Sequence, residues 1–369
     1  MNKKFLGKNF RLAIPGSFMV RFRDSLMKAV SLPLCLTLAT MVSASLVANE
    51  LDSSPFALRF PTALGHLNFY GDVAAMSGSA GASKWESSPN PSNKSWVFPA
   101  EYDWRVSAQY SNVSFDNDTR IDFISESFTF DAGAAGVFRL AYLNASSNER
   151  TVGGLLPLPY LFDLDAYQLS WGKKLNDEFA IGAEVGLSQS ETIFKGPGFD
   201  VANTDKDSWS FRVGGQWKPA DKWYVGLYGD YVNGSADTAL ALPTPLGIIR
   251  GSTSDTVEQW LVHPGIAYEF AENSLVHADF EAGWTSDGET TLDIQRWSVG
   301  TDIPVVKGVF IHAGAAVDSY SNFTWSTGIG FYPSKKVFID LAYQNDAFPE
   351  LKQEFGHSQT LNASISIQW

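Results

Sequence analysis

The chain contains a single cysteine, Cys35, in 369 residues, and charged residues make up only 18% of it. We expect Cys35 to be lost on export, and a mature chain without cysteine has neither disulfides nor Cys-ligated metals. Beyond the N-terminal segment, no stretch holds the roughly 18 consecutive apolar residues that a membrane-spanning helix requires. The formal net charge is −13. Because an acidic protein repels nucleic acid, we expect no nucleic-acid partner.

The N-terminus has the pattern of a secretory signal peptide. Basic residues up to Lys28 precede an apolar run at 29–39, and small residues suited to cleavage follow. We predict that residues 1–48 are removed, with Met19 or Met27 as the candidate true start. A membrane-anchoring helix is the alternative, which the short, proline-containing run disfavours. Removal of seven basic residues and one acid lowers the formal charge from −13 to −19.

Aromatic residues reach 14% of the chain, and much of it alternates between apolar and small or polar residues. In 179–187, Phe, Ile, Ala, Val and Leu take every second position, which is the period of a half-buried β-strand. A soluble sandwich also alternates. Here, however, the apolar faces begin and end with Trp, Tyr or Phe. Short turns near residues 175, 219, 273, 305 and 334 also alternate with mostly longer loops. Both features are typical of a transmembrane β-barrel.

The last segment alternates from Leu361 to Trp369 and ends on an aromatic residue. It resembles the C-terminal targeting strand of outer-membrane barrels, which implies recognition of Trp369 by the barrel assembly machinery. A strand that merely ends the chain is the alternative. Counting back from Trp369 gives eleven strands from 165 to 369. A periplasmic N-terminus requires an odd number before them, and the candidates are 104–110, 121–130 and 137–143.

We therefore predict an all-β fold, in which residues 101–369 form a transmembrane antiparallel up-and-down β-barrel. The expected count is about fourteen strands, with twelve or sixteen as alternatives. The expected location is the bacterial outer membrane, in contact with its lipids and lipopolysaccharide.

Residues 49–100 do not alternate well, and are either a first strand with an external loop or a plug. The segment holds Ala75-x-x-Gly78-x-x-Gly81-Ala82 and then Asn90-Pro91. Here the sequence resembles the FadL-type family of outer-membrane long-chain fatty-acid and hydrocarbon transporters, as a divergent, short member. Members begin with such a small-residue segment, an Asn-Pro and then the first strand. The usual Asn-Pro-Ala is Asn90-Pro91-Ser92 here, and an acidic pair common in the family is replaced by residues 83–86.

The resemblance implies a small N-terminal plug over 49–100, inside a barrel that takes up apolar molecules. It further implies capture at external loops and release sideways through the wall. The plug residues that it points to are Gly78, Gly81, Asn90 and Pro91.

Two external segments, 155–162 and 238–249, are unexpectedly apolar for surfaces that face water. We interpret them as a capture groove for a hydrophobic small-molecule ligand. The alternatives are loops that fold over each other, or strands that extend into the lipid headgroups. Their prolines favour ordered loops over longer strands. The candidate binding residues are Leu155, Leu156, Leu158, Tyr160, Leu161, Phe162, Leu240, Leu242, Leu246, Ile248 and Ile249.

The alternate strand positions that carry polar residues are expected to face the lumen, and we predict that their side chains form a polar network there. Its candidate members are Glu184, Arg212, Asp230, Glu269, His277, Asp279, Glu281 and Arg296. A three-residue turn at 272–274 would place Glu269 opposite His277, a pair that could perform acid–base chemistry. We favour a solvated network that braces the lumen or grips a plug. The histidines lack a metal-binding spacing, and we expect no catalytic residue, metal or cofactor.

Three functions follow from the sequence. The first is a passive channel for hydrophobic small molecules of the long-chain fatty-acid or hydrocarbon class. The second is a general porin or structural barrel for polar solutes, and the third is a lipid-modifying barrel enzyme. An interior plug would favour the first, and an open, water-filled lumen the second.

Overall fold

A computed structural model describes residues 103–152, 158–196, 199–244 and 247–369, together with short pieces of the N-terminal part. These pieces are residues 59–60, 73–74, 76–77, 81–82 and 89–93. The signal peptide predicted for 1–48 lies outside the described residues, as do Gly78, Leu155, Leu156 and Leu246. Within the described residues, no helix has the length and apolar character needed to cross a bilayer.

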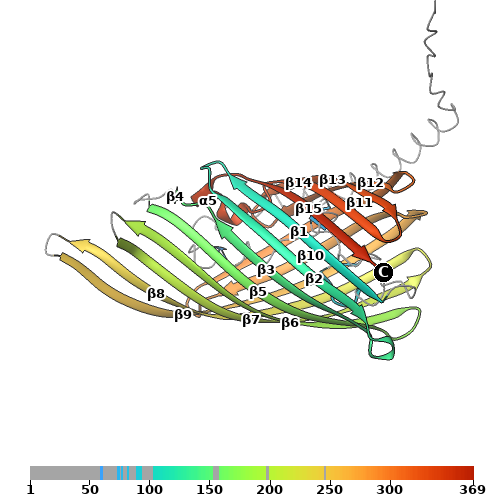
Figure 1. Cartoon of the computed structure of the whole chain (residues 1–369), viewed down its shortest axis with the longest axis horizontal. Coiled ribbons are helices and arrows are strands. Elements are labelled where there is room, and N and C mark those ends of the chain that lie inside the picture. The colour runs from blue at the N-terminus through green and yellow to red at the C-terminus, as the bar shows by residue number, and fades with distance from the viewer. Residues whose placement is uncertain are drawn as a thin grey trace, which may run out of the picture.

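Fourteen antiparallel strands close into a barrel, which confirms the predicted fold class and strand count (Figure 1). Neighbours in sequence are neighbours in the wall, and β15 pairs with β1 to close it. The short strand β4 (Arg150–Val152) adds only to β5. The barrel strands are β1 (Trp104–Phe115), β2 (Arg120–Asp131), β3 (Val137–Ser147), β5 (Leu158–Lys174), β6 (Phe179–Gly196), β7 (Phe199–Ala220), β8 (Trp223–Thr244), β9 (Gly247–Ala271), β10 (Ser274–Ser286), β11 (Thr291–Val306), β12 (Val309–Asp318), β13 (Phe323–Ser334), β14 (Val337–Asn345) and β15 (Ser358–Gln368).

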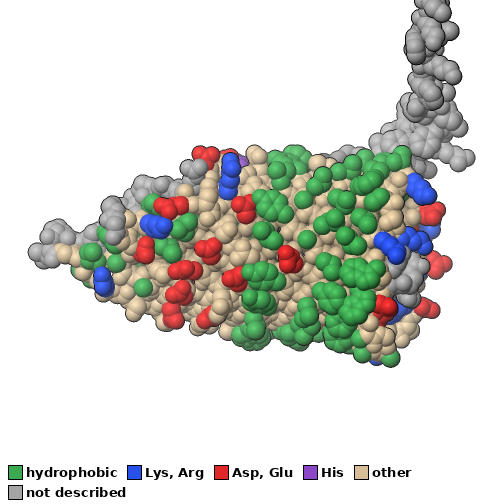
Figure 2. Space-filling model, viewed as in Figure 1, with side chains coloured by type: hydrophobic (Ala, Val, Ile, Leu, Met, Phe, Trp, Pro, Cys, Tyr) green, Lys and Arg blue, Asp and Glu red, His purple; other side chains and the backbone are tan. Residues whose placement is uncertain are grey.

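The alternation in sequence sorts side chains between the two faces of the wall. On β1, Trp104, Val106 and Tyr110 are exposed, whereas Arg105 and Gln109 between them are buried. On the face that Figure 2 shows, the exposed apolar side chains gather in one belt across the strands. Exposed Trp and Tyr side chains occur at the belt's edges, as the aromatic girdles of a membrane barrel require.

The four neighbouring strands β6 to β9 are the longest of the wall. The strands β6 to β9 have 18, 22, 22 and 25 residues, whereas β12 has 10 and β14 has 9. They run past the apolar belt into a surface with many acidic side chains (Figure 2). Asp205 and Asp207 of β7 are exposed. Water rather than lipid therefore surrounds this extension.

The apolar segment 238–249 belongs to this extension. Leu240 pairs with Gly251, and Pro243 pairs with Ile248, in one long hairpin. The expectation that the prolines favour ordered loops over longer strands is wrong here, and also for residues 158–162, which open β5. Pro243 lies at the tip of the hairpin, where a missing backbone N–H disturbs the ladder little.

Connections at the C-terminal end of β15 are short, as predicted. Between β9 and β10, only Glu272 and Asn273 are unpaired, and Asn273 has a left-handed backbone with φ 56°. Because asparagine tolerates that conformation, two residues suffice for the turn. A register shift after Ser274 then places Glu269 opposite Leu275. The expected three-residue turn and the Glu269–His277 pair are therefore wrong.

At the opposite, outer end, the connection between β14 and β15 contains helical turns. It contains η3 (Pro349–Leu351) and α5 (Lys352–Phe355). We call residues 346–357 the outer lid. Its buried side chains place it against the interior of the barrel.

Candidate functional site

The interior of the barrel is polar halfway along, and Arg212 on β7 lies at the centre of one half of this region. The register places Arg212 between Glu184 on β6 and Asp230 on β8. Its Nη2 donates to Asp230 Oδ2 at 2.6 Å, and its Nη1 to Glu184 Oε1 at 3.3 Å. The ion pairs therefore form between cross-strand neighbours on the inward phase of β6, β7 and β8.

Three buried histidines form the other half. His263 lies 3.1 Å from Asp279 and 3.3 Å from Glu281 across β9 and β10. On β10, His277 lies 3.3 Å from Asp302 of β11.

His312 on β12 extends the same series of charged groups. It lies between Asp302 and Asp340, at 2.5 Å and 3.5 Å. The sequence showed these histidines only as scattered residues, because the strand register that aligns them links positions far apart. Among the described residues, no group of three or more His, Cys, Asp or Glu side chains is arranged to hold a metal ion.

The other predicted network members lie at the two ends. Glu269 accepts a hydrogen bond from the Asn273 backbone N–H at 2.9 Å, and so stabilises a turn. Arg296 donates to Glu350 of the outer lid at 3.0 Å. The predicted network thus divides into a polar middle and two contacts at the rims.

Residues of the N-terminal part bond to this polar middle. The backbone N–H of Gly81 donates to Asp279 Oδ2 at 2.7 Å, and His277 Nδ1 donates to the carbonyl of Ala82 at 3.2 Å. Asn90 Nδ2 donates to the carbonyl of Gly215 at 3.1 Å. Asn90 and Ala82 are fully buried. The described pieces of 73–93 thus lie inside the barrel.

Glycines on the wall allow this close approach. A Cβ added at Gly226 would lie 2.1 Å from the carbonyl oxygen of Gly81, and one at Gly214 would lie 2.2 Å from Asn90 Oδ1. At Gly182 and Gly314, the nearest atoms are the carbonyl carbons of Pro91 and Met76, at 2.4 Å and 2.3 Å. Only glycine fits such positions. Glycine on the inward phase of neighbouring strands is a sequence signal for a backbone packed against the wall, and our sequence-based expectations did not use it.

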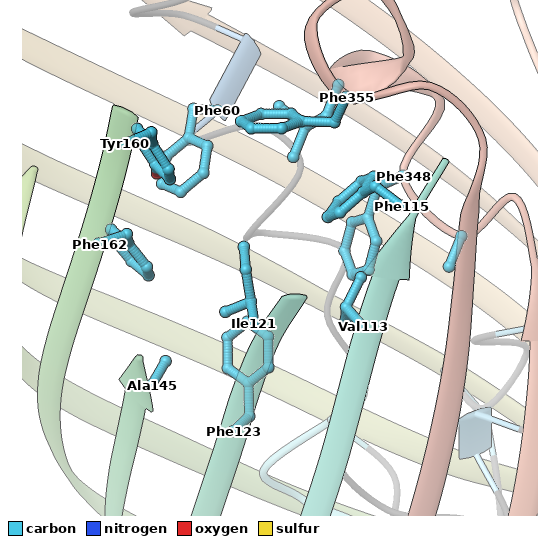
Figure 3. Close-up of a cluster of buried hydrophobic side chains, with 12 residues drawn as sticks. Phe60, Val113, Phe115, Ile121, Phe123, Ala145, Tyr160, Phe162, Phe348 and Phe355 are labelled. Carbon is cyan, nitrogen blue, oxygen red and sulfur yellow. The ribbon is translucent and has the colours of Figure 1, made fainter. Parts of the chain in front are cut away.

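The outer end of the interior is apolar instead. Buried side chains from β1, β2, β3, β5, the outer lid and Phe60 form one cluster, which we call the outer aromatic cluster (Figure 3). The rings of Phe60 and Phe162 are 4.9 Å apart, and those of Phe115 and Phe355 are 5.1 Å apart. The members are Phe60, Val113, Phe115, Ile121, Phe123, Ala145, Tyr160, Phe162, Ala347, Phe348, Leu351 and Phe355.

Of the predicted capture residues, Tyr160 and Phe162 belong to this cluster. The structure does not bring the second segment to it, because Leu240, Ile248 and Ile249 are exposed on the long hairpin. Leu161 lies on the opposite face of β5 from its two neighbours and is half-buried. Leu158 and Leu242 lie in β5 and β8, and their side chains are outside the described set.

The sequence held a signal for the cluster that we missed. Along β1 the inward phase begins with Arg105, Ser107 and Gln109, and then changes to Val113 and Phe115. Apolar residues in a phase that is otherwise polar indicate that the lumen changes character toward its outer end.

Comparison with known proteins shows which solved structures have a similar fold. No protein-family model and no curated protein sequence matches the chain. Among solved structures, the monoaromatic hydrocarbon channel CymD superposes with a TM-score of 0.59 at 12% identity. The alignment covers 82% of this chain and 98% of CymD. The chain has the FadL-type barrel fold.

Two further structures support this assignment with the same coverage of both chains. The Pseudomonas putida toluene transporter TodX gives a TM-score of 0.55 at 13% identity, and a Pseudomonas aeruginosa FadL homologue gives 0.52 at 12%. These neighbours of the FadL-type fold are transport proteins rather than enzymes.

Proposed function

We propose that this protein is a channel of the bacterial outer membrane for the passive uptake of hydrophobic small molecules. The observation that carries the proposal is the outer aromatic cluster. A pore for polar solutes would present water and polar side chains at its mouth, whereas here Tyr160 and Phe162 are at most 1% exposed among other rings. An apolar molecule gains free energy by replacing such rings or packing between them.

The polar middle supports the same proposal against a general porin. Residues 81–82 and 89–93 occupy the interior at the level of Arg212 and His277. A solute that passes the cluster must therefore displace these residues or leave through the wall. The ladders from β1 through β2 and β3 to β5 pair without a register shift, so a sideways exit requires these strands to separate.

The surface fits an outer-membrane location. The apolar belt with its aromatic edges would contact lipid and lipopolysaccharide, and the acidic extension of β6 to β9 would stand outside the cell. Trp369, exposed at 52%, joins the closing seam, where its N–H donates to the carbonyl of Trp104 at 3.1 Å. We propose Trp369 as the contact of the barrel assembly machinery.

For the substrate, we favour an uncharged hydrocarbon. The cations next to the cluster, Arg59 and Arg296, are each bonded to a glutamate of the outer lid. A ligand carboxylate would meet these acids. Of the two neighbours, CymD is a monoaromatic hydrocarbon channel and TodX is a toluene transporter.

A long-chain fatty acid is the second candidate, favoured by Lys206. This lysine is on the inward phase of β7 between Ser190 and Ala236, and among the described residues no carboxylate lies within ion-pair distance of it. Oleate uptake that falls in Lys206→Met, with toluene uptake unchanged, would select the fatty acid.

The test is uptake of toluene into proteoliposomes. We expect Phe162→Asp to lower the rate by about tenfold or more, because a buried, unpaired carboxylate resists both burial and an apolar ligand. Ile249→Asp, on the exposed hairpin, is the matched control and should leave the rate unchanged. Each variant is first checked for a heat-modifiable barrel on gels. Equal uptake by folded Phe162→Asp and wild type would remove the cluster from the mechanism.

A further inference from the structure

The outer lid has the construction of a movable cover. Its inner face consists of Phe348, Leu351 and Phe355, exposed by 4%, 2% and 0%. Left-handed backbone conformations stand at both of its ends, with φ 55° at Asp346 and 84° at Gly356. The segment between them contacts the cluster by its rings, and Phe355 lies 5.6 Å from Tyr160 (Figure 3). The lid is therefore a folded unit seated on an apolar surface.

An arginine from the N-terminal part fastens this unit from inside the barrel. Arg59, exposed by only 3%, donates from Nη1 to the Glu350 carbonyl at 3.1 Å and to Glu354 Oε2 at 2.8 Å. Its second terminal nitrogen bonds the other Glu354 oxygen, so the pair is bidentate. Arg296 of β11 holds the buried carboxylate of Glu350 at 3.0 Å.

The neighbour of Arg59 joins the same cluster from the other side. Phe60 packs its ring against Phe162 at 4.9 Å and faces Tyr160 at 6.5 Å, both edge to face. A ligand that enters the cluster must displace the lid ring Phe355 or the N-terminal ring Phe60. Either movement shifts one partner of the Arg59–Glu354 ion pair, because Phe60 follows Arg59 in the chain and Phe355 follows Glu354.

We propose that the outer lid is the gate of the channel, and that Arg59 latches it so that opening the mouth and moving the N-terminal part are one event. The inference rests on the proposed function for what passes the gate. The gate itself is a property of the fold, and can be tested without transport.

The first experiment measures how fast a maleimide labels Leu351→Cys in the full barrel, in a Cys35→Ser background. The buried thiol should react slowly in the otherwise wild-type barrel, and at least about tenfold faster with Arg59→Gln. The charge-swapped pair Arg59→Glu with Glu354→Arg should return the rate toward wild type. Lys195→Gln, which breaks an exposed ion pair with Glu149 at the same end, is the control and should change nothing. Equal labelling in all variants would overturn the latch.

The second experiment locks the lid and keeps Arg59 intact, in case Arg59→Gln fails to fold. Asn117→Cys with Glu354→Cys, at two positions that are in contact across 3.5 Å and outside the outer aromatic cluster, is oxidised to a disulfide, and toluene uptake into proteoliposomes is measured before and after reduction. Oxidation should stop uptake, and reduction should restore it. The two single-cysteine variants should not respond. If uptake continues through the locked barrel, the lid is not the gate. If the wild-type barrel takes up no toluene, the proposed function fails, while the labelling experiment still decides the latch.

Discussion

The polar middle and the outer aromatic cluster both lie on the inward face of the wall, the first on β6 to β12 and β14 and the second on β1, β2, β3 and β5, yet they hold the N-terminal part in opposite ways. In the middle, ion pairs and glycines hold residues 81–82 and 89–93 by specific hydrogen bonds and close backbone contact. In the cluster, Phe60 is held by ring contacts that another apolar molecule could replace. One pore therefore holds the N-terminal part by fixed contacts in the polar middle and by replaceable contacts in the outer aromatic cluster.

The largest effect on stability is expected from removing the Arg212 ion pairs of the polar middle. Arg212→Met leaves Glu184 and Asp230 buried without their cation, which should destabilise the barrel by about 3–5 kcal/mol. The measurement is urea unfolding in detergent. The triple variant Glu184→Gln, Arg212→Met, Asp230→Asn removes all three charges and should recover much of the loss. If the single and triple variants are equally unstable, the charges are not the reason.

A smaller effect is expected from filling the space at one glycine. Gly226→Ala places a methyl group 2.1 Å from the Gly81 carbonyl oxygen, so the backbone must shift, at a cost of about 1–3 kcal/mol. Movement of this segment should also raise the conductance of the barrel for small ions in planar bilayers. Gly229→Ala on the same strand is the control, since its nearest atom is 3.6 Å away. Unchanged conductance and stability in Gly226→Ala would show that the close packing of the N-terminal part does not depend on glycine at this position.

The smallest effect on stability is expected at Lys206, a charged residue toward the outer end of the barrel. It lies on β7 beyond the apolar belt, and burial lowers its pKa from 10.5 to about 8. The folded state therefore binds fewer protons than the unfolded state between those pH values, so wild-type stability should rise as pH increases from about 8 to 10.5.

Lys206→Met removes this dependence. The variant should be more stable than wild type by less than about 1 kcal/mol at pH 7, and equal to it above pH 10.5. The comparison is made by urea midpoints at both pH values. A wild type whose midpoint does not rise with pH would show that Lys206 is solvated.

The barrel could be predicted from sequence because its signal is local and repeated. Alternation located the strands, and parity fixed the first three before residue 165. The register at 272–274 could not be predicted, since it depends on Asn273 adopting a left-handed conformation. The length of the 238–249 hairpin was missed because proline was treated as a break, although a hairpin tip tolerates it.

The candidate site was predicted only in part. Tyr160 and Phe162 were named from a run of apolar residues. Phe60, Phe115 and Phe355 were not, since nothing in their local sequence marks them as one group. They meet because β15 closes on β1, which brings residues 115 and 355 together across most of the chain. Such contacts follow from closure of the wall, and local patterns do not encode them.

The unequal lengths of the strands give the mouth a direction. The tall strands β6 to β9 rise on one side, and the outer lid sits over the side of β1, β14 and β15, where the wall is low (Figure 1). The mouth is therefore asymmetric. A molecule that approaches along the surface from the low side contacts the outer lid first. A molecule that approaches from the side of β6 to β9 first meets their acidic extension.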